Sequence, residues 1–376
     1  MAGLYIHIPF CRQACAYCNF HFTTSLRSKN ELISALLKEL ELQHQNNYLG
    51  TTDLETIYFG GGTPSLLELN EIEAILKAAT SLWNLNKDAE ITLEANPDDI
   101  SDLQLEGWKQ AGINRLSIGI QSLYDEDLKW MNRAHTAAEA RAVLARSRKA
   151  GFEQFTVDLI YGTPGLTDEK WMNNLKWVVD EGLRHVSCYA LTVEDKTPLS
   201  KQIARQLKQD TDPEQQRNQF LMLMDFMEQQ GFEHYEISNF AKPGHRSQHN
   251  SAYWNGTPYL GVGPSAHSFD GVSRQWNCSN NRHYIEALKQ NNIPFEQELL
   301  TPTQRLNEYI MTHLRLAEGC DLELIAAQYG NEESLRLEKL AQTYEQRGWL
   351  AAYNRKLILT REGKLFADRI AAELFL

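Results

Sequence analysis

Short strand-like segments alternate with helix-like segments through the first two thirds of the chain. The strand signals lie at residues 4–8, 56–59, 90–94, 115–119, 154–160 and 185–191. Helical patterns occupy residues 29–43, 69–82, 101–111, 137–150 and 168–181. This alternation predicts an α/β fold with parallel strands joined by crossover helices. Six strands fit a partial (β/α)6 TIM-like barrel, although an open doubly wound sheet has the same local pattern. In both, the chemistry lies beyond the carboxyl ends of the strands.

The last third of the chain has a different composition. Residues 240–271 are rich in Gly, Pro, Ser, Asn and His, which indicates ordered loop around short elements. Helical patterns return after Pro302, and two short strand signals follow at residues 350–352 and 356–359. These patterns predict a small C-terminal winged-helix-like α+β domain. We therefore expect a core at 1–239, a loop-rich segment at 240–300 and the C-terminal domain at 301–376.

Three cysteines fall within eight residues directly after the first strand signal. Their spacing is Cys11-x3-Cys15-x2-Cys18, and the other three cysteines of the chain are far apart. In a reducing compartment, clustered thiols favour a metal site over disulfides. Three thiolates can hold three irons of a four-iron cluster and leave the fourth open to chelate a small molecule. A structural zinc site completed by His21 is the alternative, although no second ligand pair is obvious.

The net charge and the N-terminal residues indicate which partners and which compartment to expect. The chain has 37 Lys and Arg residues against 49 Asp and Glu residues, a formal net charge of −12. That balance argues against nucleic acid as a partner and disfavours adhesion to an anionic membrane. The N-terminus lacks a signal-peptide pattern, and no segment approaches the ~18 apolar residues of a membrane span. We expect a cytoplasmic protein; peripheral membrane contact and a homodimer remain open.

A glycine-rich turn, Gly60-Gly-Gly-Thr-Pro64, follows the second strand signal. Glycines allow close approach of the backbone to a ligand, although such turns are common. Together with the cysteine motif, this turn resembles the radical SAM superfamily. The longer phrases, from Tyr5 to Cys11 and from Tyr58 to Pro64, resemble the branch of HemN-type oxygen-independent coproporphyrinogen III oxidases and HemW-type haem chaperones. The resemblance implies a [4Fe–4S] cluster and S-adenosyl-L-methionine (SAM) as cofactors.

The resemblance also implies roles for individual residues. The cluster ligands would be the three cysteines of the motif. The other residues that match cofactor-binding positions are Tyr5 beside the cluster, Gly61, Gly62 and Thr63 at the methionine part of SAM, Glu94, Gln121, Arg133 at the SAM carboxylate, and Asp158 near the ribose. From the residues alone, Glu94 or Asp158 could instead cap the following helix, and Arg133 could be a surface charge.

Two features separate the branches of this family. Phe20 stands where HemN-type oxidases typically have a further cysteine, and only ten residues precede Cys11. The segment His249-Asn-Ser-Ala-Tyr253-Trp254 matches a motif typical of HemW-type proteins. A neutral imidazole can ligate haem iron, although a histidine in a polar loop more often only forms hydrogen bonds.

The resemblance therefore implies a haem chaperone on a radical SAM scaffold. Such a protein binds haem and a SAM-capped cluster, and passes haem to haem-requiring, respiratory proteins. The alternative is an oxygen-independent coproporphyrinogen III oxidase, which decarboxylates its substrate through a 5′-deoxyadenosyl radical. A third hypothesis is a zinc-stabilised binding module with neither SAM nor cluster.

Overall fold

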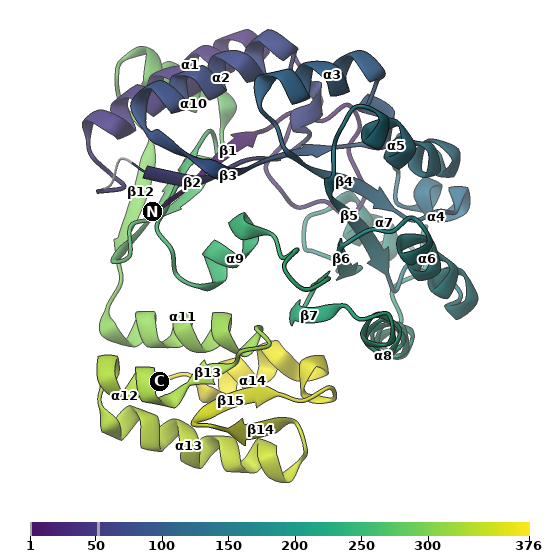
Figure 1. Ribbon diagram of the computed structural model, residues 1–376, viewed down its shortest axis with the longest axis vertical. Coiled ribbons are helices and arrows are strands. Elements are labelled where there is room, and N and C mark those ends of the chain that lie inside the picture. The colour runs from purple at the N-terminus through teal and green to yellow at the C-terminus, as the bar shows by residue number, and fades with distance from the viewer. Residues whose placement is uncertain (1, 51–52) are drawn as a thin grey trace.

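A computed structural model describes residues 2–50 and 53–376, which form a curved sheet with helices along its outer face and a smaller body beside it (Figure 1). Within those residues the large sheet has 12 strands in the order β12-β11-β10-β9-β1-β2-β3-β4-β5-β6-β8-β7. Strands β1 to β6 stand in chain order, and each pairs in parallel with the next. A doubly wound sheet reverses its strand order at a switch point. The order seen here confirms the partial (β/α)6 barrel.

The barrel strands and their covering helices agree with the sequence-based expectations to within a few residues. The strands are β1 (Ala2–Ile8), β2 (Asp53–Gly61), β3 (Asn84–Ala95), β4 (Arg115–Gln121), β5 (Gln154–Tyr161) and β6 (His185–Ala190). The predicted helices are α1 (Lys29–Gln45), α2 (Leu69–Leu82), α3 (Asp102–Ala111), α5 (Ala137–Lys149) and α6 (Asp168–Asp180). Thr136 and Thr167 cap α5 and α6 by accepting backbone N–H groups through their side chains.

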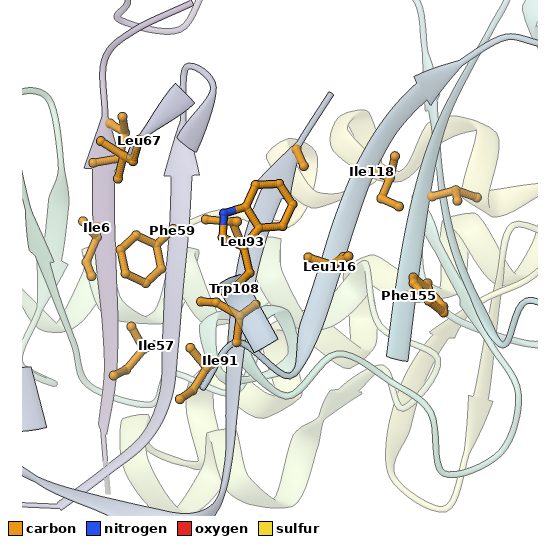
Figure 2. Packing of buried hydrophobic residues seen from close by; sticks show 14 of the residues in the cluster. Ile6, Ile57, Phe59, Leu67, Ile91, Leu93, Trp108, Leu116, Ile118 and Phe155 are labelled. Carbon is orange, nitrogen blue, oxygen red and sulfur yellow. The ribbon is translucent and has the colours of Figure 1, made fainter. Parts of the chain in front are cut away.

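The main hydrophobic core lies between the strands and these helices. Successive residues of a strand point to opposite faces of a sheet. Phe59 and Leu93 therefore face the helices from neighbouring strands, and the Trp108 indole of α3 lies beside Leu93 (Figure 2). The alternate residues of β3, which include Glu90 and Glu94, face inward. The interior of the barrel is consequently polar, and its polar groups carry the candidate site.

Several elements of the barrel region were not anticipated. They are α4 (Asp125–Trp130), α7 (Pro198–Ala204), α8 (Pro213–Gln229), β7 (Glu233–Glu236) and β8 (Asn239–Ala241). Helix α8 buries Phe220, Leu223, Met224 and Met227, an i, i+3, i+4, i+7 pattern that predicts a helix. Strand β8 pairs antiparallel with both β6 and β7, which ends the parallel part of the sheet.

The loop-rich segment extends the same sheet at its other edge. Its elements are α9 (Gln248–Trp254), β9 (Tyr259–Val262), β10 (His267–Phe269), β11 (Ser273–Asn277), α10 (Asn281–Lys289) and β12 (Phe295–Leu299). Strand β9 pairs in parallel with β1, and the strands after it pair antiparallel. Helix α9 crosses the open side of the barrel, between the sheet and α11 (Figure 1).

The C-terminal residues form a second hydrophobic core. The elements are α11 (Pro302–Leu314), β13 (Cys320–Asp321), α12 (Leu322–Tyr329), α13 (Asn331–Gln346), β14 (Leu350–Tyr353), β15 (Lys356–Leu359) and α14 (Ala367–Leu374). Helices followed by the β14–β15 hairpin agree with the expected winged-helix-like α+β domain, and α14 was not anticipated. The division at residues 239 and 300 stays a prediction. In the described part of the chain, no helix has the length and apolar character needed to cross a bilayer.

Candidate cofactor-binding site

A cavity of about 440 Å³ opens where the parallel strands end. Ten of the predicted site residues line it: Cys11, Cys15, Cys18, Gly61, Gly62, Thr63, Glu94, Gln121, Arg133 and Asp158. They come from the loops and strand ends of β1 to β5, although they are spread from residue 11 to residue 158 of the chain. Tyr5 and His249 are not among the lining residues. The geometry therefore supports one shared binding site for most of the predicted set.

The cysteine loop is held in place by the loop between α4 and α5. The Ala16 N–H donates to the Met131 carbonyl at 3.0 Å, and the Asn132 side-chain amide donates to the Ala14 carbonyl at 2.7 Å. Arg12 forms an ion pair with the buried Asp99 at 2.7 Å. These contacts order the loop before any metal binds, which favours binding because less conformational entropy is lost.

Burial disfavours the thiolate form at two of the three cysteines of this loop. Burial raises the pKa of Cys11 and of Cys18 to about 11. The Cys15 Sγ accepts a hydrogen bond from Arg133 Nη1 at 3.3 Å. Because thiolates are the ligands of iron–sulfur clusters, loading this loop with iron must release protons.

The zinc alternative finds little support in this arrangement. The His21 ring nitrogen Nε2 bonds to Asn281 Oδ1 at 2.7 Å, and His21 does not line the cavity. Among residues 2–50 and 53–376, no three His, Cys, Asp or Glu side chains lie close enough to hold one metal ion. The thiolates of a four-iron cluster bind different irons and so lie farther apart than the ligands of a single ion.

Arg133 is a partly buried residue that lines the cavity. Its Nη2 donates to Asn96 Oδ1 at 2.5 Å and to the Gly119 carbonyl at 2.8 Å. Its Nε is buried and has no hydrogen-bond partner in the described part of the chain. Burial disfavours the charge, but the facing Tyr17 and Cys15 raise the pKa, so Arg133 stays cationic. An unpaired buried N–H beside a cavity fits a ligand carboxylate, such as that of SAM.

Two partly buried carboxyl groups, those of Glu94 and Asp158, line the same cavity. Glu94 accepts hydrogen bonds from the Tyr58 hydroxyl at 2.8 Å and the Gly61 N–H at 3.2 Å. Burial raises the pKa of Glu94 to about 7 and that of Asp158 to about 6. Burial without a cationic partner is costly for a carboxylate. A ligand with an ammonium group, as SAM has, would supply that partner.

The backbone of the cavity wall adopts conformations that permit close approach. Gly61 has φ of 107°, and a Cβ on it would lie 2.6 Å from the His7 ring. A Cβ on Gly62 would lie 2.6 Å from the Phe10 carbonyl oxygen. Gln121 has φ of 65°, a left-handed conformation that is uncommon outside glycine. The two glycines are therefore required for close packing of the turn against the end of β1 and the start of the cysteine loop.

Tyr5 lies beneath the cavity in a stack of rings inside the barrel. Its ring stacks on Tyr58 with centroids 6.1 Å apart, and Tyr58 stacks on His249 at 4.8 Å. The Tyr5 hydroxyl bonds to His7 Nδ1 at 3.2 Å. Tyr58 therefore connects the two groups of predicted residues, since its hydroxyl reaches Glu94 in the cavity.

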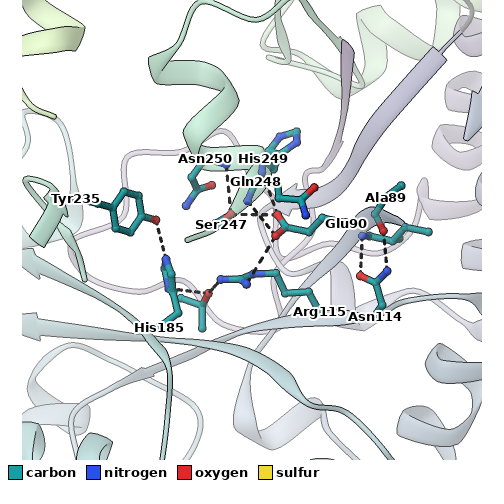
Figure 3. A network of polar contacts seen from close by, with 12 residues as sticks. Ala89, Glu90, Asn114, Arg115, His185, Tyr235, Ser247, Gln248, His249 and Asn250 are labelled. Atoms are coloured by element: carbon teal, nitrogen blue, oxygen red, sulfur yellow. Dashed lines mark hydrogen bonds and ion pairs between the residues drawn. The ribbon is translucent and has the colours of Figure 1, made fainter. Parts of the chain in front are cut away.

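His249 is buried on α9 with both ring nitrogens hydrogen-bonded. Nδ1 bonds to the Thr56 hydroxyl at 2.7 Å and Nε2 to the Tyr253 hydroxyl at 2.9 Å. Burial lowers the pKa of His249 to about 3, so the imidazole is neutral at physiological pH. Figure 3 shows the start of α9 against Glu90, whose carboxylate accepts the His249 N–H at 3.0 Å. A neutral imidazole suits iron ligation, and iron at Nε2 would replace the Tyr253 hydroxyl.

Tyr58 and Asn96 have contacts in the site that the sequence-based analysis did not anticipate. Tyr58 belongs to one of the phrases that carried the family resemblance, and Asn96 lies two residues after Glu94, but neither was given a role. Their contacts depend on strand register, since β2 and β3 pair Tyr58 with Thr92, two residues before Glu94. Residues two apart share a face of the sheet, and that periodicity was the available signal.

Comparison with known proteins agrees with this geometry. The family described as the radical SAM superfamily matches residues 5–178, and the HemN C-terminal domain matches residues 300–366. In the solved structure of coproporphyrinogen III oxidase (HemN) from Escherichia coli, the fold is similar, with a TM-score of 0.85 and 23% sequence identity. The match covers 100% of this chain and 90% of that one.

Curated relatives match along nearly the whole chain. The heme chaperone HemW of Bacillus subtilis (strain 168) is 31% identical over 98% of this chain and 98% of its own length. The heme chaperone HemW of Synechocystis sp. is 34% identical over 93% of this chain and 86% of its own length. The mitochondrial radical S-adenosyl methionine domain-containing protein 1 of Bos taurus is 37% identical over 71% of this chain and 60% of its own length. The chain belongs to the radical SAM superfamily, in the family of these HemW proteins.

Proposed function

We propose that this protein is a haem chaperone on a radical SAM scaffold. It binds haem and a SAM-capped [4Fe–4S] cluster, and it passes haem to haem-requiring, respiratory proteins. The observation that carries the proposal is the near full-length similarity to relatives named heme chaperone HemW, at 31% and 34% identity. The buried neutral imidazole of His249 supplies a group suited to haem iron.

The cluster and SAM belong to the cavity at the strand ends. Cys11, Cys15 and Cys18 are the proposed ligands of three irons, and the open fourth iron would bind SAM. The reduced cluster would supply one electron to SAM. Arg133 would bind the SAM carboxylate, and Glu94 would pair with its ammonium group. The unpartnered Arg133 Nε and the raised pKa of Glu94 support these assignments.

Cysteine replacement tests the cluster assignment. Anaerobic reconstitution of the parent chain should give about four irons and four sulfides per chain. Replacement of Cys11, Cys15 or Cys18 by Ala should abolish the cluster. The matched controls are the remaining cysteines, Cys188, Cys278 and Cys320, whose Ala variants should retain it. Loss of the cluster in a control variant, with the fold intact, would contradict the ligand set.

Haem titration tests the chaperone function. The full chain should bind about one haem with a shifted Soret band, as a single axial site gives. His249→Ala should weaken binding or change the spectrum, whereas His283→Ala, at an exposed position on α10, should not. A His249→Ala spectrum identical to that of the parent would remove His249 as ligand. Delivery of haem to an acceptor apoprotein is the second measurement, and a parent chain that binds no haem refutes the function.

Oxidation of coproporphyrinogen III is the second candidate function. The similar fold of the Escherichia coli oxidase favours it. Against it stands Phe20, which is 67% exposed at the mouth of the cavity where the oxidases typically place a cysteine. The deciding assay is anaerobic incubation with reduced cluster, SAM and coproporphyrinogen III. Steady formation of the decarboxylated product, lost in Cys15→Ala, would establish the enzyme.

A further inference from the structure

A second and larger cavity lies at the opposite end of the barrel strands. It has a volume of about 550 Å³. Arg115, Gln154 and His185, the first residues of β4, β5 and β6, contribute to its walls. Residues 244–246 and Gln248, before and at the start of α9, complete this side of the cavity. The cofactor cavity uses the other ends of the same strands. The two cavities are therefore separate, and nothing in the proposed cofactor chemistry uses the second one.

Four arginines line this cavity: Arg115, Arg148, Arg184 and Arg246. Such a concentration is unusual in a chain whose acidic residues exceed its basic ones by 12. The acidic residues among the lining are Glu90 and Glu153. A surface that only needed solvation would not gather four guanidinium groups around one hollow, because like charges repel.

The arginines differ in how well they are paired. Arg148 bonds to Glu181 at 3.0 Å, and Arg246 pairs with Glu318 at 2.7 Å. The Arg184 guanidinium is exposed and has no hydrogen-bond or ion-pair partner among the described residues. Arg115 is buried, and its Nη2 donates to the Thr156 hydroxyl at 2.5 Å. Its Nη1 lies 3.7 Å from a Glu90 carboxylate oxygen, beyond hydrogen-bond length. Two of the four cations thus retain donor capacity toward the cavity.

The positive charge of the arginines also affects the two histidines that line the cavity, His185 and His245. Burial and the neighbouring Arg115 lower the pKa of His185, and burial together with Arg184 and Arg115 lowers that of His245. Both rings are therefore neutral at physiological pH. Both ring nitrogens of His185 are already hydrogen-bonded, to the Thr156 hydroxyl at 3.0 Å and the Tyr235 hydroxyl at 2.7 Å. His245 can therefore add one neutral donor to the cavity.

We propose that this cavity binds a ligand with clustered anionic oxygens, either phosphate groups or paired carboxylates. Arginine forks bind such oxygens two at a time, and the bonds are stronger when the anion is desolvated. Two sources share this chemistry: a small phosphate-bearing molecule, and the two propionates of haem. The second source rests on the proposed haem function, whereas the first does not.

The cavity is connected to the His249 segment through one carboxylate. Glu90 faces Arg115 on one side and accepts the Gln248 and His249 N–H groups at 3.0 Å on the other (Figure 3). An anion that engages Arg115 competes with Glu90 for that guanidinium. Binding in the cavity therefore changes how firmly the start of α9 is held, which couples the cavity to the proposed haem ligand.

The first experiment uses pyrophosphate as the probe and calorimetric titration of the full chain at low ionic strength. The variant is Arg184→Gln, which removes a cation without breaking an internal contact. The matched control is Arg282→Gln, at an exposed arginine of α10 outside the cavity. Removal of one charge-assisted contact should raise the Kd about tenfold in Arg184→Gln and leave the control unchanged. That result establishes the anion site whether or not the protein binds haem.

The second experiment identifies the source of the anion. Haem and its dimethyl ester, which has no charged propionates, are titrated into the parent and both variants. Weaker haem binding in Arg184→Gln, with ester binding unchanged, assigns the cavity to the propionates. If pyrophosphate binds but Arg184→Gln binds haem as tightly as the parent does, the cavity is assigned to a phosphate-bearing molecule. If Arg184→Gln matches Arg282→Gln with every probe, or the parent binds none of them, the proposal is overturned.

Discussion

Among single residues, Arg133 contacts three different parts of the cofactor cavity. It joins the cysteine loop through Cys15, the end of β3 through Asn96 and β4 through Gly119. None of these three acceptors is a carboxylate. No carboxylate at hydrogen-bond distance therefore balances the charge of the guanidinium. A partly buried cation in this position attracts a ligand anion more strongly than an exposed one does, because water screens it less.

Replacement of Arg133 measures that attraction. Arg133→Ala should weaken SAM binding by about tenfold or more, the loss expected for one charge-assisted contact. The SAM affinity of Arg133→Lys should lie between those of the parent and Arg133→Ala. An ammonium keeps the charge but lacks the planar fork of two parallel N–H donors. Equilibrium dialysis of cluster-loaded protein, or the SAM-dependent change in the EPR signal, gives the affinity. Arg141→Ala, at an exposed position of α5, is the control, and an unchanged affinity in Arg133→Ala contradicts the role.

The pKa values of Glu94 and Asp158 predict how the affinity for SAM depends on pH. Burial raises the pKa of Glu94 to about 7 and of Asp158 to about 6, so both take up protons as the pH falls through this range. A protonated carboxyl no longer attracts the SAM ammonium. Affinity should therefore be highest at pH 8 and fall by up to about tenfold per pH unit below 7. Glu94→Gln should flatten the upper part of this profile; an equally steep profile in that variant would exclude Glu94. Cluster absorbance at each pH verifies that the protein is intact.

At the scale of elements, α9 depends on a contact with a distant strand. It has 7 residues, too few for a stable isolated helix. Glu90 of β3 accepts hydrogen bonds from the Ser247 hydroxyl at 3.1 Å and from the first N–H groups of the helix at 3.0 Å. A carboxylate at this end also opposes the positive end of the helix dipole. The helix that carries His249 is thus held by the barrel.

Removal of this carboxylate should destabilise the protein. Glu90→Ala deletes three hydrogen bonds and leaves Arg115 buried beside an uncompensated gap, a change that costs about 3–5 kcal/mol. Glu90→Gln should cost less, because the amide oxygen still accepts. Urea unfolding measures both, with Glu73→Ala at an exposed position of α2 as the control. A Glu90→Ala variant as stable as the control would show that α9 does not need the contact.

The difference between local signals and distant contacts explains how much of the fold and the site could be predicted from the sequence. Helix α2 was predicted with its observed limits because Ile72, Ile75, Leu76 and Ala79 repeat every three or four residues, a local signal. Helix α9 was not predicted because its stabilising partner is 157 residues away. The cysteines could be identified from spacing, whereas the Tyr58–Glu94 contact required the register of two strands. Local periodicity is readable in one sequence, and tertiary contacts are not.

At the scale of the whole molecule, two hydrophobic cores are joined by polar contacts. Ile237 is a partly buried residue that packs against both cores. The ion pair between Arg361 and Asp225, at 2.7 Å, links α8 to the C-terminal residues, and both side chains are about half exposed, at 40% and 51%. Exposed pairs of this kind contribute only about 0–1 kcal/mol. The junction also contains a pair between Arg315 and the buried Glu236 at 3.3 Å. Because the hydrophobic residues form two separate cores, we expect the two regions to open separately.

Hydrogen exchange on two core variants tests that independence in the full chain. Ile370→Ala removes a fully buried side chain of the C-terminal core, at a cost of about 2–5 kcal/mol, and Trp108→Ala one of the barrel core, at about 3–5 kcal/mol. Because each region has its own hydrophobic core, Ile370→Ala should accelerate exchange in residues 301–376 and leave α2 and α3 protected. Trp108→Ala should accelerate exchange in α2 and α3 and leave residues 301–376 protected. Acceleration of both regions in both variants would mean that the chain unfolds as one cooperative unit. The cofactor cavity is lined by residues between 11 and 194, so SAM binding should survive Ile370→Ala and weaken in Trp108→Ala.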